Sequence, residues 1–207
     1  MLIGVPKEIK VFENRVGLTP TSVREMIGNS HQVLVETNAG HAIGFDDTDY
    51  EAAGASIAGT AGDVFAKAEM VVKVKEPQAS EIAVLSDGQI LFTYLHLAPD
   101  EKQTQGLLDS GCTGIAYETV TDNRGGLPLL APMSEVAGRM AVQAGATCLE
   151  IAHGGRGVLL GGVPGVTPGK VVVIGGGVVG SNSVFVATGM GGHVTVIDRD
   201  IRRLAEI

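Results

Sequence analysis

Short runs of apolar, often β-branched residues alternate in the first part of the chain with segments of helical spacing. Five of these runs are typical of strands: 2–5, 32–36, 70–75, 89–94 and 114–118. The segments between them begin with helix start signals, such as Pro20 after Thr19 and the pair Asp100 and Glu101 after Pro99. Strands separated by helix-length segments predict an α/β fold, in which a parallel sheet carries helices on both faces.

The later part of the chain changes pattern. An alanine-rich stretch over 134–152 predicts one long helix, and a turn-rich segment leads from it to the apolar run 171–174, which is typical of a strand buried on both faces. A helix over 178–188, a strand over 194–197 and a helix from Asp200 should follow. We therefore expect a Rossmann-like α/β domain over 1–133, a linking helix over 134–152 and the beginning of a second, doubly wound domain over 153–207. Because a complete doubly wound fold needs more strands, we expect the chain to be truncated.

Composition narrows the class of protein. Apolar residues make up 44% of the chain and charged residues 18%, which is typical of a soluble globular protein. The net charge of −8, without a basic run, argues against nucleic acid and anionic lipid as partners. Cys112 and Cys148 have neither disulfide nor metal spacing, so we predict no metal site and a reduced, cytoplasmic location. The start of the chain lacks a signal peptide's apolar region, and Pro164 and Pro168 interrupt the apolar stretch 157–180, so no membrane segment is expected.

A glycine motif opens the second domain. Residues 175–180 satisfy G-x-G-x-x-G between a strand and a helix, and an acid follows at the end of the next strand, 23 positions after the first glycine. Glycines allow the tight turn, the approach of backbone to a pyrophosphate and close helix packing, while the acid binds ribose hydroxyls and favours NAD over NADP. The predicted cofactor-binding residues are Gly175, Gly177, Val178, Val179, Gly180 and Asp198. The alternative is that these glycines only form turns in a flavodoxin-like sheet and that Asp198 caps the next helix.

Basic side chains in the first domain suit a small anionic substrate. Arg15 lies in a loop after a strand, where a guanidinium could grip a carboxylate with two hydrogen bonds, although pairing with a surface glutamate is the more ordinary interpretation. Lys73 and Lys75 alternate with valines at strand period, so both should point to one face and one of them could end in a cleft. Otherwise the strand lies at an edge and both lysines are solvated or pair with Glu76.

Two further residues occupy positions that suit chemistry. His96 follows a strand's carboxyl end, where folds of this class place their ligands, and its near-neutral pKa suits proton transfer. Ser134 precedes the long helix as a natural N-cap and could also touch a cofactor. The remaining histidines are interpreted as structural: His31, His41, His153 and His193.

Several segments together resemble the alanine dehydrogenase family. The matching pieces are 3–10, 15–20, 72–77, 92–97, 127–138 and 161–166, which with the glycine loop extend over essentially the whole chain. The resemblance implies a Rossmann-like substrate domain followed by the first part of an NAD-binding domain. It also implies reversible oxidative deamination of L-alanine to pyruvate and ammonium, with NAD as cofactor, in a cytoplasmic homo-hexamer.

The resemblance assigns roles to residues. Arg15 and Lys75 would bind the carboxylate and carbonyl oxygens of pyruvate, with His96 as the acid/base residue and Lys75 also catalytic. Ser134, the glycine loop and Asp198 would contact NAD, with Arg203 near its adenosine end. Because the family places further catalytic and nicotinamide contacts later in the chain, we expect these 207 residues alone to have little or no activity.

One departure from the family pattern and two alternatives remain. The helix after the glycine loop begins with the polar and bulky stretch 181–186, which could disturb the packing of helix on sheet. The chain could instead be the nucleotide-binding part of a proton-translocating transhydrogenase, although such a protein needs no keto-acid acid/base like His96. It could also be a non-catalytic oligomerisation or binding module.

Overall fold

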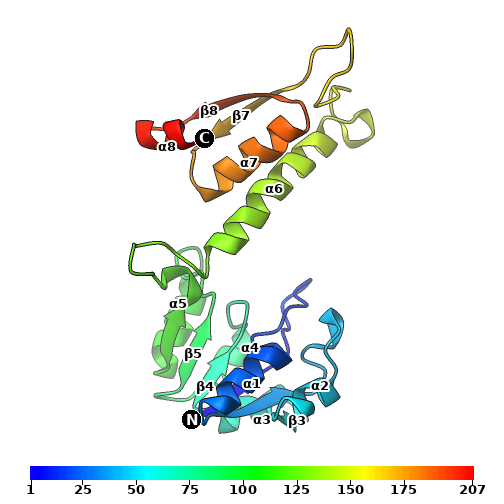
Figure 1. Ribbon diagram of the computed structural model, residues 1–207. Coiled ribbons are helices and arrows are strands. Elements are labelled where there is room, and N and C mark those ends of the chain that lie inside the picture. The colour runs from blue at the N-terminus through cyan, green and yellow to red at the C-terminus, as the bar shows by residue number, and fades with distance from the viewer. The chain divides into compact units, whose positions relative to one another are not determined.

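The computed structural model describes all 207 residues and divides into two compact units, residues 1–120 and 121–207 (Figure 1). None of the helices combines the length and the apolar character that a membrane-spanning helix requires.

The first unit alternates strands and helices along the whole of its length. Its elements are β1 (Leu2–Val5), α1 (Pro20–Gly28), β2 (Gln32–Glu36), a 3-10 turn (His41–Ile43), α2 (Asp47–Ala52), β3 (Ser56–Ala58), α3 (Ala61–Lys67), β4 (Met70–Val72), α4 (Ala79–Ile82), β5 (Ile90–Thr93), α5 (Glu101–Ser110), β6 (Thr113–Ala116) and a second 3-10 turn (Tyr117–Thr119).

The six strands form one sheet in the order β3-β2-β1-β4-β5-β6, and every neighbouring pair is parallel. The chain winds outward from β1 to β3 and then returns to the centre at β4. This is the strand order of a doubly wound fold, in which ligands bind outside the carboxyl ends of the central strands. The predicted α/β class is confirmed.

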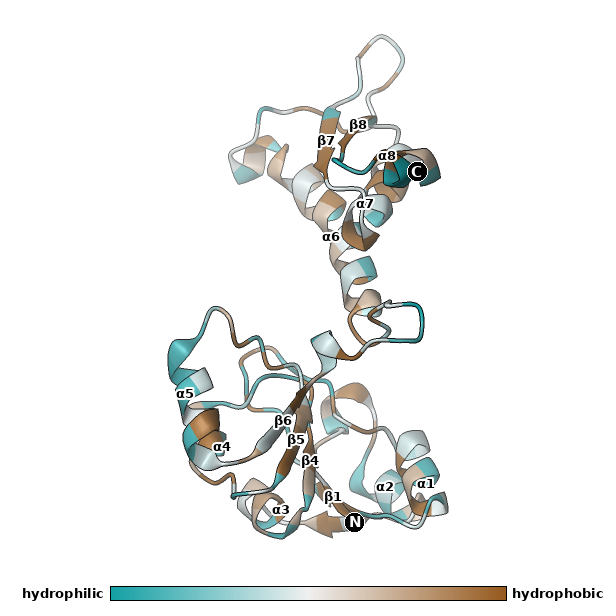
Figure 2. Cartoon of the chain, turned by 90° about the vertical axis from the view of Figure 1, so that its left-hand side faces the viewer, coloured by the Kyte–Doolittle hydropathy of each residue, from teal (hydrophilic) through white to brown (hydrophobic).

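Helices cover both faces of this sheet (Figure 2). On one face, α1 and α2 bury Val23 and Tyr50 against strand residues such as Val35. On the other, Phe65 of α3 and Leu107 of α5 pack against the central strands, together with α4. The two apolar layers leave little room for charge inside the sheet, so any buried ion there must be paired.

Local signals explain where these helices begin. The Thr19 side chain accepts the N–H of Ser22 at the start of α1, and that of Asp100 accepts the N–H of Gln103 at the start of α5, as predicted. The predicted strand 70–75 is wrong in its second half, since β4 ends at Val72. Its neighbour β1 ends just before Pro6, and beyond that point the N–H of Val74 goes to a glutamate side chain instead of a strand.

The second unit holds a long helix and a two-stranded parallel sheet. Its elements are α6 (Ala131–Cys148), a 3-10 turn (Ile151–His153), β7 (Lys170–Ile174), α7 (Val178–Gly189), β8 (His193–Ile197) and α8 (Ile201–Glu206). The predicted strand–helix–strand–helix order after 170 is confirmed. The predicted burial of β7 on both faces is not seen within this unit: Val173 is buried, but Ile174 is 85% exposed.

The long helix starts earlier than predicted, and Ser134 is not its N-cap. The cap position is Leu130, and Ser134 lies in the first turn with its N–H bonded to the Leu130 carbonyl. The start moves because Pro132 has no N–H to lose and fits a first helical turn.

The polar beginning of α7 faces α6 rather than disturbing it. Ser183 is buried and its hydroxyl donates to the Gly138 carbonyl at 2.8 Å, while the Asn182 side chain accepts from Arg139 at 3.0 Å. Gly138 is required there, because a Cβ would lie 2.3 Å from the Val179 carbonyl oxygen. Phe185 is 70% exposed, while Val186 and Ala187 of the same helix pack with Val171 and Val194 of the sheet, so the expected disturbance of helix-on-sheet packing does not arise.

Candidate functional sites

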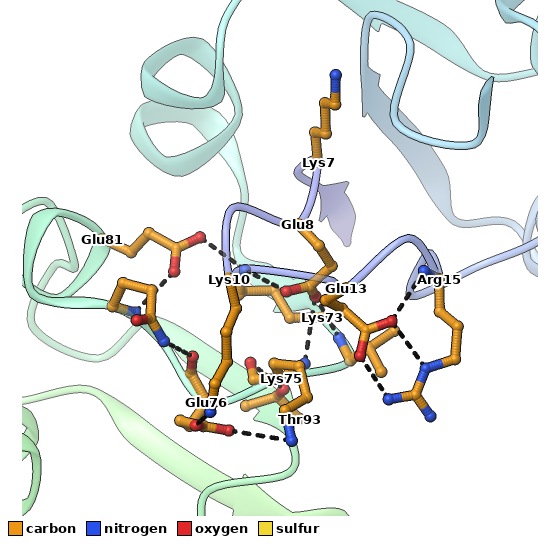
Figure 3. A network of polar contacts seen from close by, with 12 residues as sticks. Lys7, Glu8, Lys10, Glu13, Arg15, Lys73, Lys75, Glu76, Glu81 and Thr93 are labelled. Carbon is orange, nitrogen blue, oxygen red and sulfur yellow. Dashed lines mark hydrogen bonds and ion pairs between the residues drawn. The ribbon is translucent and has the colours of Figure 1, made fainter. Parts of the chain in front are cut away.

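Polar side chains of the first unit gather where β1 and β4 end (Figure 3). The loop that carries Arg15 approaches this edge through Gly17, where an added Cβ would lie 2.4 Å from the Val72 carbonyl oxygen. Glycine therefore lets the loop lie directly on the end of β4. Close backbone contact at Gly17 therefore places the loop with Arg15 at the sheet.

Arg15 is held by its near neighbour Glu13. The Glu13 carboxylate accepts from the Arg15 backbone N–H and from Nε at 2.8 Å and Nη2 at 2.5 Å. These bonds hold the pKa of Glu13 below its ordinary value and raise the pKa of Arg15. The ordinary interpretation of Arg15, an arginine paired with a glutamate, is thus correct about the pairing, but the pair lies beside the other candidate residues rather than on a remote surface.

Lys73 is fully buried between two carboxylates. Its Nζ lies 2.6 Å from Glu81 and 3.3 Å from Glu8, and all three side chains are at most 5% exposed. The remaining oxygen of Glu8 accepts the backbone N–H groups of Val74 and Lys75, while Glu81 also accepts the N–H of Gln78. Lys73 therefore stabilises the site's frame and does not face a ligand. The edge position in the alternative interpretation is wrong, because β4 lies between β1 and β5, whereas its pairing with Glu76 is found for Lys75.

Lys75 is the lysine that remains accessible. Its side chain is 24% exposed, and its Nζ lies 3.7 Å from Glu76. The Lys75 backbone is fixed on both sides, since its N–H goes to Glu8 and its carbonyl accepts the hydroxyl of Thr93 at 2.8 Å. A charged amine on a fixed backbone at the end of a central strand can hold and polarise an anionic ligand.

His96 follows β5 in an unusual backbone conformation. Its φ of +48° lies in the left-handed region, and its ring stacks on that of Tyr94 with centroids 5.9 Å apart. Tyr94 in turn lies close enough to Arg15 for the guanidinium to lower its pKa, although burial raises it more. The Tyr94 ring thus lies close to both the histidine and the arginine.

In the second unit, the turn after β7 is built by backbone. Gly175 has a φ of +95°, and a Cβ on Gly180 would lie 1.8 Å from the Gly175 carbonyl oxygen. A Cβ on Gly177 would meet nothing within 4 Å, so this residue borders open space at the N-terminus of α7. Free N–H groups at the start of a helix beside open space suit a phosphate anion.

Asp198 ties the second strand of this unit to the glycine turn. Its carboxylate accepts the N–H of Gly176 at 2.5 Å and the N–H of Asp200 at 2.8 Å. The bonds from Asp200 and then Gly176 lower the pKa of Asp198, so it is a carboxylate at neutral pH. The alternative that Asp198 caps the next helix is wrong, because Asp200 occupies that position.

A hollow of about 900 Å³ lies along the unpaired edge of β7, within the second unit. Its lining includes residues from α6, from the glycine turn and from α8. The predicted cofactor residues found there are Ser134, Gly175, Gly177, Val178, Val179, Gly180 and Arg203. The hollow has room for an organic group beside the helix N-terminus.

The structure brings some of the predicted substrate-site residues together and not others. Arg15, Lys75 and His96 lie in one polar region of the first unit, whereas Lys73 is a buried structural cation. Sequence reasoning missed the carboxylates Glu8 and Glu13 described above, and it missed Glu118, whose carboxylate accepts the backbone N–H of His96 at 2.8 Å. Only Glu13 carried a local signal, because it lies two residues from Arg15.

Models of known families match nearly the whole chain. The N-terminal domain of "Alanine dehydrogenase/PNT" matches residues 4–137, and the C-terminal domain of the same family matches residues 141–207. The alanine dehydrogenase of Halomonas elongata is 61% identical over 204 residues, which are 99% of this chain and 55% of that protein. The alanine dehydrogenase of Bacillus subtilis is 56% identical over 207 residues, 54% of its length. The chain thus spans about half the length of these relatives.

Solved structures give the same result. A structure titled L-alanine dehydrogenase is 53% identical and superposes with a TM-score of 0.88 over 100% of this chain and 57% of that one. A transhydrogenase from Sinorhizobium meliloti is 25% identical, with a TM-score of 0.78 over 100% of this chain and 61% of that one. With both family models matched in order, the chain belongs to the alanine dehydrogenase/PNT family.

Proposed function

We propose that the protein is an NAD-dependent alanine dehydrogenase that interconverts L-alanine with pyruvate and ammonium. The observation that supports this most is the grouping of Arg15, Lys75 and His96 in one unit, where a guanidinium, an amine and an imidazole lie near the carboxyl ends of β4 and β5. Reductive amination of a small keto acid calls for an anchor for the carboxylate, a group that polarises the carbonyl and a proton carrier, and these three side chains can supply them. The identity of 52–61% to several alanine dehydrogenases supports the choice of substrate.

Each side chain has a role that follows from its chemistry. Arg15 binds the substrate carboxylate, because a guanidinium oriented by Glu13 presents donors in a fixed plane. Lys75 binds the carbonyl oxygen and stabilises the charge that develops on it when ammonia adds to the keto carbon. His96 moves the protons that addition of ammonia and loss of water require. Holding the reactants together lowers the entropic part of the barrier.

The second unit fits NAD by backbone shape. The open space at Gly177 and the start of α7 would hold the pyrophosphate, and Asp198 would accept hydrogen bonds from the ribose hydroxyls. Ser134, Gly177 and Arg203 border the hollow along β7. When bound, NAD supplies the acceptor for the hydride of alanine. The Asp198 carboxylate also repels a 2′-phosphate, which favours NAD over NADP.

Because the chain spans about 55% of the relatives' length, we propose that turnover requires the further C-terminal residues that these relatives possess. A homo-hexameric assembly and a cytoplasmic location stay predictions. The test joins residues 1–207 to the remaining C-terminal part of the Halomonas elongata enzyme and follows NADH formation from L-alanine and NAD. We expect activity in this extended protein and little or none in the 207-residue chain.

The transhydrogenase alternative is separated in the same assay. It has support from the structural similarity to the Sinorhizobium meliloti protein. An extended protein that passes hydride between NADH and an oxidised NADP analogue, yet does not oxidise alanine, would favour it. Binding of pyruvate or NAD without any turnover would favour a non-catalytic module instead.

A further inference from the structure

The backbone of the loop that carries His96 is hydrogen-bonded to one carboxylate, that of Glu118. This side chain follows β6, in the turn Tyr117–Thr119, and its Oε1 accepts the N–H of His96 at 2.8 Å and the N–H of Leu95 at 3.1 Å. Its Oε2 lies 3.3 Å from the same Leu95 nitrogen. Two consecutive backbone donors thus converge on one carboxylate.

This convergence is linked to the conformation of His96. A histidine with a φ of +48° is in a sparsely occupied region of backbone space, which persists only where surrounding contacts enforce it. Leu95 is buried and His96 is exposed, so the chain turns outward between these two residues, at the place where their N–H groups bond to Glu118. The turn places the imidazole against the Tyr94 ring at an interplanar angle of 12°.

The position of Glu118 is fixed by the packing of the residue before it. Its neighbour Tyr117 packs edge-on against Phe92 and Tyr94, with centroids 4.3 and 5.0 Å away. In addition, the amide of the buried Gln103 donates to the Leu95 carbonyl at 2.5 Å. The loop therefore has an independent second anchor, which should keep it folded when the Glu118 carboxylate is removed.

We propose that Glu118 is the positioning residue for His96: by accepting the N–H groups of Leu95 and His96 it fixes the backbone turn that aims the imidazole at the substrate. The proposal rests on the proposed function, in which His96 carries the proton. Since one oxygen accepts both bonds, a neutral amide oxygen can replace it. The role is one of hydrogen bonding and not of charge.

The enzymatic test compares Glu118→Ala, Glu118→Gln and the control Glu51→Ala, an exposed carboxylate on α2, in the extended enzyme. We expect Glu118→Ala to lower kcat on the order of 100-fold with little change in KM for alanine, because misplacing a proton-transfer group affects the reaction more than binding. Glu118→Gln should restore most of kcat, and Glu51→Ala should match the unchanged protein. Equal losses in the Ala and Gln variants would overturn the proposal.

A spectroscopic test on the 207-residue chain works even if alanine is not the substrate. In Glu118→Ala the amide hydrogens of Leu95 and His96 should exchange faster, and the ring-proton shifts of His96 should lose the effect of stacking on Tyr94. The shifts of His41, in the same unit, should stay unchanged. Unaltered exchange and unaltered His96 shifts overturn the positioning role. Absence of alanine turnover in every variant, with these changes present, instead rejects the proposed function alone.

Discussion

The cluster around Arg15, Lys75 and His96 and the glycine turn 175–180 hold their polar groups by different means. In the first unit a carboxylate holds each candidate residue: the adjacent Glu13 holds the Arg15 side chain, and the more distant Glu8 and Glu118 hold the backbones of Lys75 and His96. In the second unit the glycine turn depends on missing side chains. A Cβ on Gly180 would clash with the Gly175 carbonyl oxygen, and Gly177 borders open space. The first site should therefore fail through charge and hydrogen bonding, and the second through added volume.

The largest effect should come from the buried lysine of the first unit. Lys73→Ala leaves Glu8 and Glu81 buried without their cation, and we expect a loss of about 3–5 kcal/mol in the free energy of unfolding. Tyrosine fluorescence in urea measures this unit alone, because all three tyrosines lie in residues 1–120 and the chain has no tryptophan. Lys7→Ala, at an exposed position, is the matched control. A loss under about 1 kcal/mol in Lys73→Ala would mean that the carboxylates are solvated or protonated.

Added volume in the glycine turn should have the next largest effect. Gly180→Ala forces a Cβ toward the Gly175 carbonyl, and we expect a cost of about 1–3 kcal/mol and loss of NAD binding. Gly189→Ala in the same helix has open space and should instead stabilise by roughly 0.5–1 kcal/mol. Hydrogen exchange of the α7 amides measures the change in stability in each of the two variants. If both substitutions change the stability in the same direction, the account of the glycine turn as limited by volume is wrong.

The Glu13–Arg15 pair should make the first unit sensitive to acid. Since Arg15 holds the pKa of Glu13 below its ordinary value of 4.5, the pair contributes stability above that pH and loses it as the pH falls through the lower, folded-state pKa. We expect Glu13→Gln to cost under about 1 kcal/mol at neutral pH, because Arg15 is partly exposed, and to flatten the loss of stability in acid. Urea unfolding from neutral to acidic pH checks this. If the free energy of unfolding of the variant falls equally steeply in acid, the acid sensitivity comes from other carboxyl groups.

The smallest change in stability should follow Arg203→Ala. Arg203 pairs with Glu206 on the surface of α8, and such pairs contribute about 0–1 kcal/mol. If Arg203 also faces the adenosine end of NAD, the variant should bind NAD more weakly while unfolding almost as before. Calorimetric titration with NAD, beside the control Arg202→Ala, makes the distinction. Equal affinity in both variants would remove Arg203 from the site.

Local patterns predicted the features that depend on local chemistry. The start of α1 at Thr19 and the glycine turn before α7 follow from a few adjacent residues, so the sequence was sufficient. The true role of Lys73 was not predictable, because its partners are 65 and 8 positions away and meet it only in the folded sheet. The N-cap at Ser134 was wrong because Pro132 also fits a first helical turn. Charge pairing across a fold leaves no periodic signal in the chain.

Two separate binding regions, one for the keto acid and one for NAD, can be mapped on the isotope-labelled chain by NMR. Titration with pyruvate should shift amide signals around Arg15, Lys75 and His96 and leave the glycine turn unchanged. Titration with NAD should shift signals at Gly175, Gly177 and Asp198 and leave the first group unchanged. Pyruvate shifts that fall outside the Arg15, Lys75 and His96 cluster, or no shift in either region, would contradict this division of roles.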